Sequence, residues 1–342
     1  MTRLRTSRVR VALVVAFLLV AGVLVFSATR PAGAAPGGAV GTVLSRVATT
    51  GPTTRDVRAY SGQGAWVDAF DFSPEYQKAG AAPPLTPAIA VDDMAAHGVH
   101  TLFLQAARPD STSPDGLVDR AILAEFLVRA HLRGMRVVGW YLPTFADVDA
   151  DLSRLLAIER FNVLGHRFDG LAVDIEDVDT VADPGDRNRR LVDLSTRLRE
   201  AVGSEAVGAI VLPPVLTEVV NPARWPDFPW TEVAPLYNVW LPMSYWTFRT
   251  VSSGYHDGYT YNDESTRRLR ADLGDPNALV HAIGGISDTA TATELTDFVK
   301  SLYDDHAIGG SIYDWNASPT ASRDLMAQQF ASGPGASLPP PP

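Results

Sequence analysis

The chain has 342 residues, of which 46% are hydrophobic and 20% are charged, a composition typical of a globular protein with a large core. Its formal net charge is −10 and no basic stripe runs along it, which argues against nucleic acid as a partner. It contains no cysteine, which excludes disulfide bonds, thiolate catalysis and thiolate metal sites.

The N-terminus is organised like an export signal. A basic segment, residues 1–10, precedes an uninterrupted apolar run from Val11 to Phe26, and small residues follow at positions 32–34. We therefore predict that residues 1–34 are a signal peptide or an N-terminal membrane anchor, with membrane anchoring through residues 11–28 in the second case. Both alternatives predict a protein that is secreted or held on the outer face of the cytoplasmic membrane.

The rest of the chain divides into three parts by composition. Residues 35–60 are rich in Ala, Gly, Pro, Thr and Ser and are predicted to form a flexible linker. Residues 332–342 are predicted to form a disordered, Pro-rich tail. Between them, residues 61–331 are predicted to form one domain.

Short apolar segments alternate with amphipathic ones in this domain. The apolar segments are residues 64–72, 98–106, 134–143, 168–177, 205–214, 237–246, 278–287 and 307–316. They recur at intervals of roughly 30 to 40 residues, which suits a strand, a helix and two loops. Eight such units without a repeated sequence predict an α/β fold, a single-domain (β/α)8 TIM barrel, with a doubly wound open sheet as the alternative.

The fourth apolar segment, residues 168–177, ends in carboxylates. Side chains alternate across a strand, so Asp174 and Glu176 share the face of Ala172. The opposite face carries Leu171, Val173 and Ile175. In a barrel that face is the interior, and the C-terminal ends of the strands build the active site. The pattern predicts two catalytic carboxyl groups; the alternative is a half-exposed edge strand.

Polar and aromatic residues also end the other strands. Acids surrounded by aromatic rings indicate a carbohydrate substrate, because aromatic faces stack on sugar rings and carboxyl groups act on the glycosidic bond. The predicted substrate-binding residues are Asp68, Asp71, Gln105, Trp140, Tyr141, Asp177, Met243, Trp246, Tyr313 and Trp315. The loop of residues 247–263 is long enough to form a lid or a wall of the binding site.

The segment from Phe168 to Glu176 resembles the strand-four signature of the family 18 glycoside hydrolases, which include chitinases and endo-N-acetylglucosaminidases. Asp169, Gly170, Asp174 and Glu176 match that signature. The resemblance implies a barrel hydrolase in which Glu176 is the acid.

The resemblance extends to two other strands and departs at two positions. Residues 243–245 match the start of the family's Met-x-Tyr-Asp motif, and Trp315 stands where the family keeps the Trp that floors the catalytic subsite. Ala172 replaces the family's first inner acid, and Trp246 replaces the Asp that ends the strand-six motif. In the family those acids support attack by the substrate's N-acetyl group, so the resemblance implies an acid-catalysed hydrolase more firmly than chitin as substrate.

The residues themselves suggest a mechanism. We expect Glu176 to be the general acid, its pKa raised by apolar surroundings and by the charge of Asp174. Asp174 is expected to stay ionised and to stabilise positive charge on the substrate, and Tyr245 to donate a hydrogen bond to it.

The sequence leaves two choices open: which residue is the second carboxylate, and whether the barrel is catalytic. Asp68, Asp71 and Asp314 are candidate second carboxylates. No cofactor and no metal are predicted, because the histidines lack metal-ligand spacing. The alternative function is a non-catalytic carbohydrate-binding barrel of the cell envelope, which the departures at Ala172 and Trp246 favour.

Overall fold

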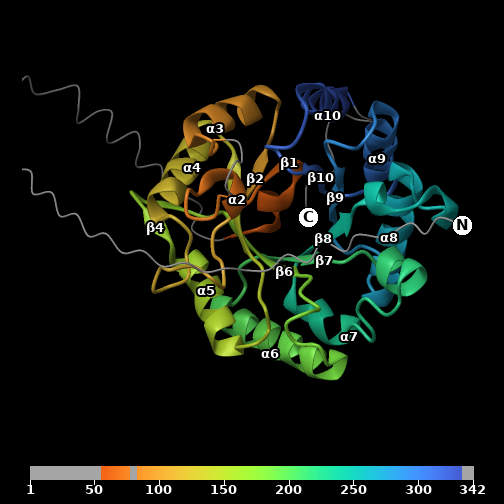
Figure 1. Ribbon diagram of the computed structural model, residues 1–342, viewed down its shortest axis with the longest axis horizontal. Coiled ribbons are helices and arrows are strands. Elements are labelled where there is room, and N and C mark those ends of the chain that lie inside the picture. Colours follow the sequence, from red (N-terminus) through yellow and green to blue (C-terminus); the bar gives the residue numbers. More distant parts are fainter. Residues whose placement is uncertain (1–54, 78–82, 333–342) are drawn as a thin grey trace, which may run out of the picture. The chain divides into compact units, whose positions relative to one another are not determined.

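Eight parallel strands close into a barrel in the computed structural model, which describes residues 55–77 and 83–332 (Figure 1). The strands are β1 (Gly62–Val67), β2 (Thr101–Gln105), β3 (Arg136–Tyr141), β6 (Gly170–Ile175), β7 (Val207–Val211), β8 (Val239–Ser244), β9 (His281–Ile286) and β10 (Gly309–Tyr313). Their order around the barrel is β1-β10-β9-β8-β7-β6-β3-β2. The predicted (β/α)8 barrel is confirmed. The open sheet is excluded because β1 pairs with β10 on one side and with β2 on the other, which closes the sheet.

Helices surround the strands in Figure 1 and connect each strand to the next. They are α3 (Pro87–Ala96), α4 (Arg120–Leu132), α5 (Val148–Arg160), α6 (Pro184–Val202), α7 (Trp230–Val233), α8 (Gly258–Asp272), α9 (Ala292–Asp304) and α10 (Thr320–Ser332). A short hairpin of β4 (Asn162–Val163) and β5 (His166–Arg167) precedes β6. The connection from β7 to β8 is irregular, with a π-helical turn, η2 (Val215–Val220), the one-turn helix α7 and a 3-10 turn, η3 (Ala234–Leu236).

Two predicted strands are shorter than expected because turns begin at their ends. The segment of residues 64–72 leaves the barrel after Val67, where Asp68 caps the short helix α2 (Ala69–Phe72) by accepting hydrogen bonds from two backbone N–H groups. The segment of residues 237–246 ends as a strand at Ser244 and continues into the 3-10 turn η4 (Trp246–Phe248).

The apolar side chains form two cores, one inside the barrel and one between the barrel and its helices. The inner core includes Trp66, Phe103, Val138, Trp140, Ala172, Ile210, Leu241, Met243 and Ile283. Leu171, Val173 and Ile175 belong to the outer core. The alternation predicted for β6 is therefore confirmed, and Ala172 lies beneath the carboxyl side chains that follow it.

Tyr60 closes the end of the barrel opposite its mouth. It ends the 3-10 turn η1 (Val57–Tyr60), it is fully buried, and its hydroxyl donates to the Leu171 carbonyl over 2.7 Å. Glycine is required where the ring passes the strands, because a Cβ at Gly170 would lie 2.9 Å from the Tyr60 hydroxyl oxygen and one at Gly208 would lie 2.8 Å from the ring. The barrel is thus open at one end only.

Residues 55–60 pack against the barrel, which corrects the expected linker boundary. Arg55 is buried, and its Nε donates to the Phe168 carbonyl over 2.9 Å. Its guanidinium also pairs with Glu159 and Glu205, one from α5 and one from the turn before β7. The packed domain therefore includes at least the last six residues of the predicted linker.

The predicted export segment and nearly all of the predicted tail lie outside the described residues. Among residues 55–77 and 83–332, no helix combines the length and the hydropathy that spanning a membrane requires.

Candidate active site

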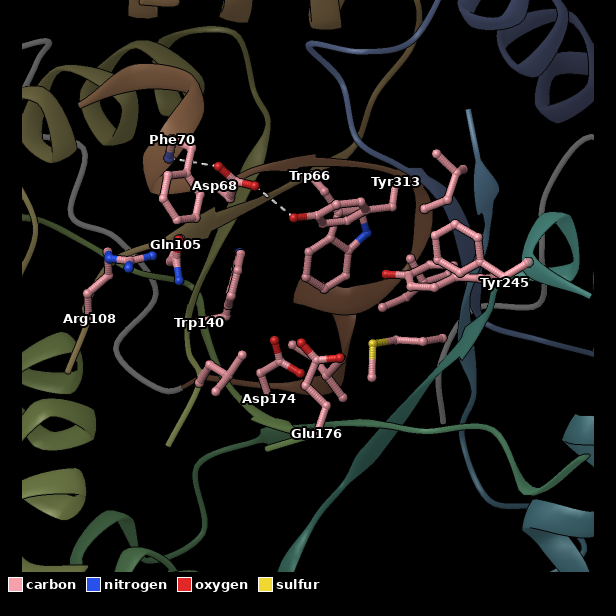
Figure 2. A pocket seen from close by; sticks show the side chains of 16 residues that line it. Trp66, Asp68, Phe70, Gln105, Arg108, Trp140, Asp174, Glu176, Tyr245 and Tyr313 are labelled. Atoms are coloured by element: carbon pink, nitrogen blue, oxygen red, sulfur yellow. Dashed lines mark hydrogen bonds between the residues drawn. The ribbon is translucent and has the colours of Figure 1, made fainter. Parts of the chain in front are cut away.

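A cavity of about 330 Å³ opens at the C-terminal ends of the strands (Figure 2). This is the end of the barrel where the sequence predicts the site. Of the residues predicted from the sequence, those that line the cavity are Asp68, Gln105, Trp140, Asp174, Glu176, Met243, Tyr245 and Tyr313. The cavity is also lined by residues that were not predicted to bind substrate, namely Trp66, Phe70, Arg108, Leu142, Ile210, Phe248, Ile283 and Ile286.

Asp174 and Glu176 enter the cavity side by side from β6, as Figure 2 shows. Asp174 is the deeper of the two: it is only 6% exposed, whereas Glu176 is half-buried. Among the described residues, no group donates a hydrogen bond to Asp174 Oδ1, although that atom is buried. A buried carboxyl oxygen without a donor disfavours the ionised form.

The pKa values of both carboxyl groups are raised. Burial raises the pKa of Asp174 well above its ordinary value, and the negative charge of Glu176 adds to the effect. Burial also raises the pKa of Glu176, where Arg224 opposes the shift and Asp177 adds to it. The raised pKa of Glu176 agrees in direction with the expectation, whereas the raised pKa of Asp174 runs against the expectation that it stays ionised, because its surroundings favour the neutral acid.

Trp66 forms the centre of the aromatic wall. Its ring stacks on Phe103 with a centroid distance of 4.3 Å and meets Trp140 edge-on at 5.9 Å. Its Nε1 donates to Ser311 Oγ over 2.7 Å, which fixes the plane of the indole. Trp66 lies on β1 two residues before Asp68, which directly follows that strand, so the alternation used for β6 was the signal that could have found it.

A tyrosine and a carboxylate face β6 from the other side of the barrel. The Tyr313 hydroxyl donates to Asp68 Oδ2 over 2.8 Å, and Asp68 Oδ1 accepts from the backbone N–H groups of Phe70 and Asp71. These contacts hold the Asp68 side chain at the cavity wall. Of the three candidate second carboxylates, Asp68 is the one that lines the cavity.

Tyr245 lies on the wall formed by β8 and remains a neutral phenol. Burial raises its pKa well above the ordinary value, and the negative charges of Glu176 and Asp174 add to the shift. A neutral hydroxyl close to two carboxyl groups can donate a hydrogen bond to a ligand between them, which is the position that the sequence predicted for Tyr245.

Three aromatic side chains expected at the mouth lie in the outer core instead. Tyr141 follows the inward-facing Trp140, so it points outward, and its hydroxyl donates to Asp151 Oδ1 over 2.5 Å. Trp246 lies beyond the end of β8 and packs on Phe298 with a ring distance of 5.2 Å.

The third, Trp315, lies past the end of β10, with the Arg323 guanidinium 4.6 Å from its ring centroid. Trp315 is therefore not the floor of this cavity. The tryptophans that line the cavity are Trp66 and Trp140.

Asp71 and Asp177 serve the loops around the cavity. Asp71 accepts from the Asp68 N–H over 3.2 Å and from Asn316 Nδ2 over 2.9 Å, and burial raises its pKa to about 7. Asp177 accepts from the backbone N–H groups of Asp179 and Thr180 and from the Thr180 hydroxyl. The structure places both carboxylates behind the cavity wall rather than in it, which corrects their expected position.

A second cavity of about 470 Å³ adjoins the first. The residues that line both are Glu176, Met243, Tyr245 and Phe248. Because Glu176 borders both spaces, a ligand longer than one sugar can extend on either side of its carboxyl group. The second cavity also contains Arg224 and Arg249. Arg249 lies in the predicted wall loop, but no sequence pattern indicated Arg224, which lies in the irregular connection after β7.

Among the residues that the structure describes, no cluster of three or more His, Asp or Glu side chains has the arrangement of a metal site.

Comparison with known proteins was made by sequence and by structure. No protein-family model matches the chain, and no curated protein matches it. Solved structures do resemble it. The likeness is one of fold. The endo-β-1,4-mannanase from Thermotoga petrophila superimposes with a TM-score of 0.59 at 9% identity, over 82% of this chain and 79% of that chain.

Two further neighbours come from other organisms. The spore cortex-lytic enzyme SleL from Bacillus cereus has a TM-score of 0.51 at 10% identity, over 78% of this chain and 74% of that chain. The β-mannanase from the blue mussel Mytilus edulis has a TM-score of 0.52 at 10% identity, over 81% of this chain and 94% of that chain. The resemblance to family 18 stays a prediction, since no family model matches.

Proposed function

We propose that the protein is a glycoside hydrolase that acts on a polysaccharide or cell-envelope glycan, with Glu176 as the general acid. The observation that carries this proposal is the pair of carboxyl side chains, Asp174 in β6 and Glu176 directly after it, that enter one aromatic-walled cavity. Aromatic walls suit sugar rings, and a protonated carboxyl group suits a glycosidic oxygen. The structural neighbours, two of them mannanases and one a cortex-lytic enzyme, support the choice of reaction class.

Glu176 supplies the proton in this proposal. Because burial raises its pKa, Glu176 keeps its proton at a higher pH than a free glutamic acid does. It borders both cavities, so a glycosidic oxygen bound between two sugar subsites would lie beside it. Transfer of the proton to that oxygen lets the bond to the anomeric carbon break with a neutral leaving group.

Asp174 assists as a neutral acid rather than as a charged base. When Glu176 loses its proton, the carboxylate that forms lies next to the Asp174 carboxyl group, which can donate a hydrogen bond to it (Figure 2). A charge-assisted hydrogen bond of this kind is stronger than one between neutral groups. Asp174 therefore makes Glu176 a stronger acid during the reaction.

Asp68 is the second carboxylate of the proposed mechanism. It lines the cavity directly after β1, and the Tyr313 hydroxyl and two backbone N–H groups hold it in place. A carboxylate so held can stabilise the positive charge that develops at the anomeric carbon. Asp71 and Asp314 are excluded from this role because neither lines the two cavities.

The test is the release of new reducing ends from a panel of glycans. The purified protein and its Glu176→Gln variant are incubated with mannan, chitin, peptidoglycan and other envelope glycans. Release by the unmodified protein alone supports the hydrolase. Binding by both proteins without release would instead support the non-catalytic carbohydrate-binding barrel.

We also propose that the protein is exported through residues 1–34. The basic segment, the apolar run and the small residues after it support this proposal. Fractionation of the producing cells, with sequencing of the N-terminus of the mature protein, distinguishes cleavage near residue 34 from an intact membrane anchor. Recovery of the intact chain in the cytoplasm would contradict export.

A further inference from the structure

We infer that the second cavity is a subsite for a sugar that carries an anionic group, which Arg224 and Arg249 bind. The inference rests on the proposed function, since it names the class of glycan that the site accepts. It follows from two half-buried arginine side chains that form no ion pair and no side-chain hydrogen bond among the described residues.

The guanidinium groups of Arg224 and Arg249 have no ion-pair partner among residues 55–77 and 83–332. Nor does either group form a side-chain hydrogen bond within those ranges, and Arg249 Nε is buried there without a hydrogen-bond partner. The Arg249 guanidinium lies 5.9 Å from the Tyr261 ring centroid, a contact that leaves its N–H donors free for a ligand. Of the other arginines in the described ranges, all but the exposed Arg160 have their guanidinium in a hydrogen bond or an ion pair. Examples are Arg55 with Glu159, Arg199 with the Leu236 carbonyl and Arg268 with Glu264.

The two arginines come from separate elements and converge on one space. Arg224 belongs to the irregular connection after β7, and Arg249 directly follows η4. Both are half-buried and line the same cavity of about 470 Å³, a volume within the range of small-ligand sites, about 300 to 1,000 Å³. A guanidinium that is partly removed from water favours an oxyanion partner, and its fork of N–H donors fits a carboxylate or a phosphate.

The position of the arginines fixes which sugar would carry the charge. Glu176 borders the same cavity, and the positive charge of Arg224 acts on its carboxyl group. The anionic sugar would therefore occupy the subsite next to the bond that is cleaved. In the first cavity, by contrast, Arg108 is paired with Asp110 over 2.8 Å, so among the described residues that side offers aromatic rings and carboxyl groups but no arginine without an ion pair.

The first test uses three sugars with the same ring. Glucose, glucuronate and glucose 6-phosphate are titrated into the full-length Glu176→Gln variant at fixed ionic strength, and binding is followed by calorimetry. We expect the better anionic sugar to bind about 10- to 100-fold more tightly than glucose, the size of one charge-assisted hydrogen bond to a guanidinium. Comparison of glucuronate with glucose 6-phosphate shows whether the site prefers a carboxylate or a phosphate.

Variants connect the preference to these two side chains. Arg224→Gln and Arg249→Gln should each remove most of the advantage of the anionic sugar. Arg160→Gln is the matched control, because it removes the same charge from an exposed arginine on α5 and should leave the advantage intact. Equal binding of the three sugars, undetectable binding of all three, or the same loss in Arg160→Gln would overturn the inference.

Hydrolysis separates this inference from the proposed function. The ratio of kcat/KM on an acidic glycan to that on a neutral glycan should fall in the Arg224→Gln, Arg249→Gln double variant. If the unmodified protein hydrolyses neutral glycans best and the ratio does not change, the subsite assignment fails and the hydrolase stands. If no glycan is hydrolysed, the proposed function fails, and the sugar titration still decides the subsite.

Discussion

Asp174 and Glu176 lie two residues apart on β6, yet their surroundings differ. Asp174 is the more deeply buried, and its Oδ1 has no donor among the described residues, whereas Glu176 lies within the influence of Arg224. An unpaired buried polar atom costs free energy. Because Asp174 lines the cavity, a ligand bound there can supply the donor that its Oδ1 lacks.

The replacement of Asp174 by Asn should stabilise the protein at high pH. Burial raises the folded-state pKa of Asp174 above the unfolded value of 3.8, so the folded protein binds more protons, and stability falls as pH rises through the folded-state pKa. Asp174→Asn removes that loss and should add about 0.5 to 2 kcal/mol to the free energy of unfolding at pH 8. Little gain is expected at pH 4.

Urea unfolding at both pH values measures the effect. A variant that is less stable than the unmodified protein at pH 8 would show that Asp174 is ionised and stabilising in the folded state. An equal gain at pH 4 would show that the gain does not come from ionisation of Asp174.

The charge of Arg224 should set the upper pH limit of activity. Its positive charge favours the ionised form of Glu176 and so lowers the pKa of that acid. Arg224→Gln removes this effect, the pKa rises, and the alkaline limb of the kcat/KM profile should move to higher pH, because that limb reports loss of the acid's proton. Profiles of the unmodified protein, Arg224→Gln and the control Arg160→Gln measure the shift. A limb that moves to lower pH in Arg224→Gln would contradict this account.

The regular elements could be predicted from the sequence, and the irregular ones could not. The β6 alternation placed Ala172, Asp174 and Glu176 on the inner face because the period of a strand is fixed. Trp246 was misplaced because the backbone turns into η4 after β8, which hydropathy does not reveal. Arg224 was missed because the connection after β7 is irregular and its sequence has no helical or strand periodicity of apolar residues.

The turn η1 is a structural element of the barrel rather than part of a linker. Tyr60 fills the closed end, where it contacts strands β6 and β7. Tyr60→Ala should lower the free energy of unfolding by about 3 to 5 kcal/mol, because it removes a fully buried ring from the inner core and leaves a large cavity there.

Tyr60→Phe isolates the hydroxyl group from the ring. It should cost less than Tyr60→Ala, about 1 to 3 kcal/mol, since it leaves the carbonyl partners of the hydroxyl unsatisfied but fills the space. Urea unfolding of both variants measures the difference. A loss below about 1 kcal/mol for Tyr60→Ala, less than a large core truncation costs, would show that η1 does not support the fold.

At the scale of the whole molecule, the barrel brings residues from distant segments to one mouth. Asp68, Glu176 and Tyr245 each directly follow a different strand, β1, β6 and β8, and the closed strand order makes them neighbours of one space. Structural neighbours at 9% and 10% identity share this fold, so the barrel forms from sequences in which few residues are the same. The chemistry is a property of the few side chains at the mouth.

The central claim is tested most directly by comparing the loss of kcat/KM in Glu176→Gln on substrates with different leaving groups. With the sugar identified, kcat/KM is compared for a glycan and for the dinitrophenyl glycoside of the same sugar, whose leaving group needs no proton. The account predicts a loss of about 10²- to 10⁴-fold on the glycan and a much smaller loss on the dinitrophenyl glycoside. Full activity of the folded variant on the glycan, or equal losses on both substrates, would contradict Glu176 as the general acid.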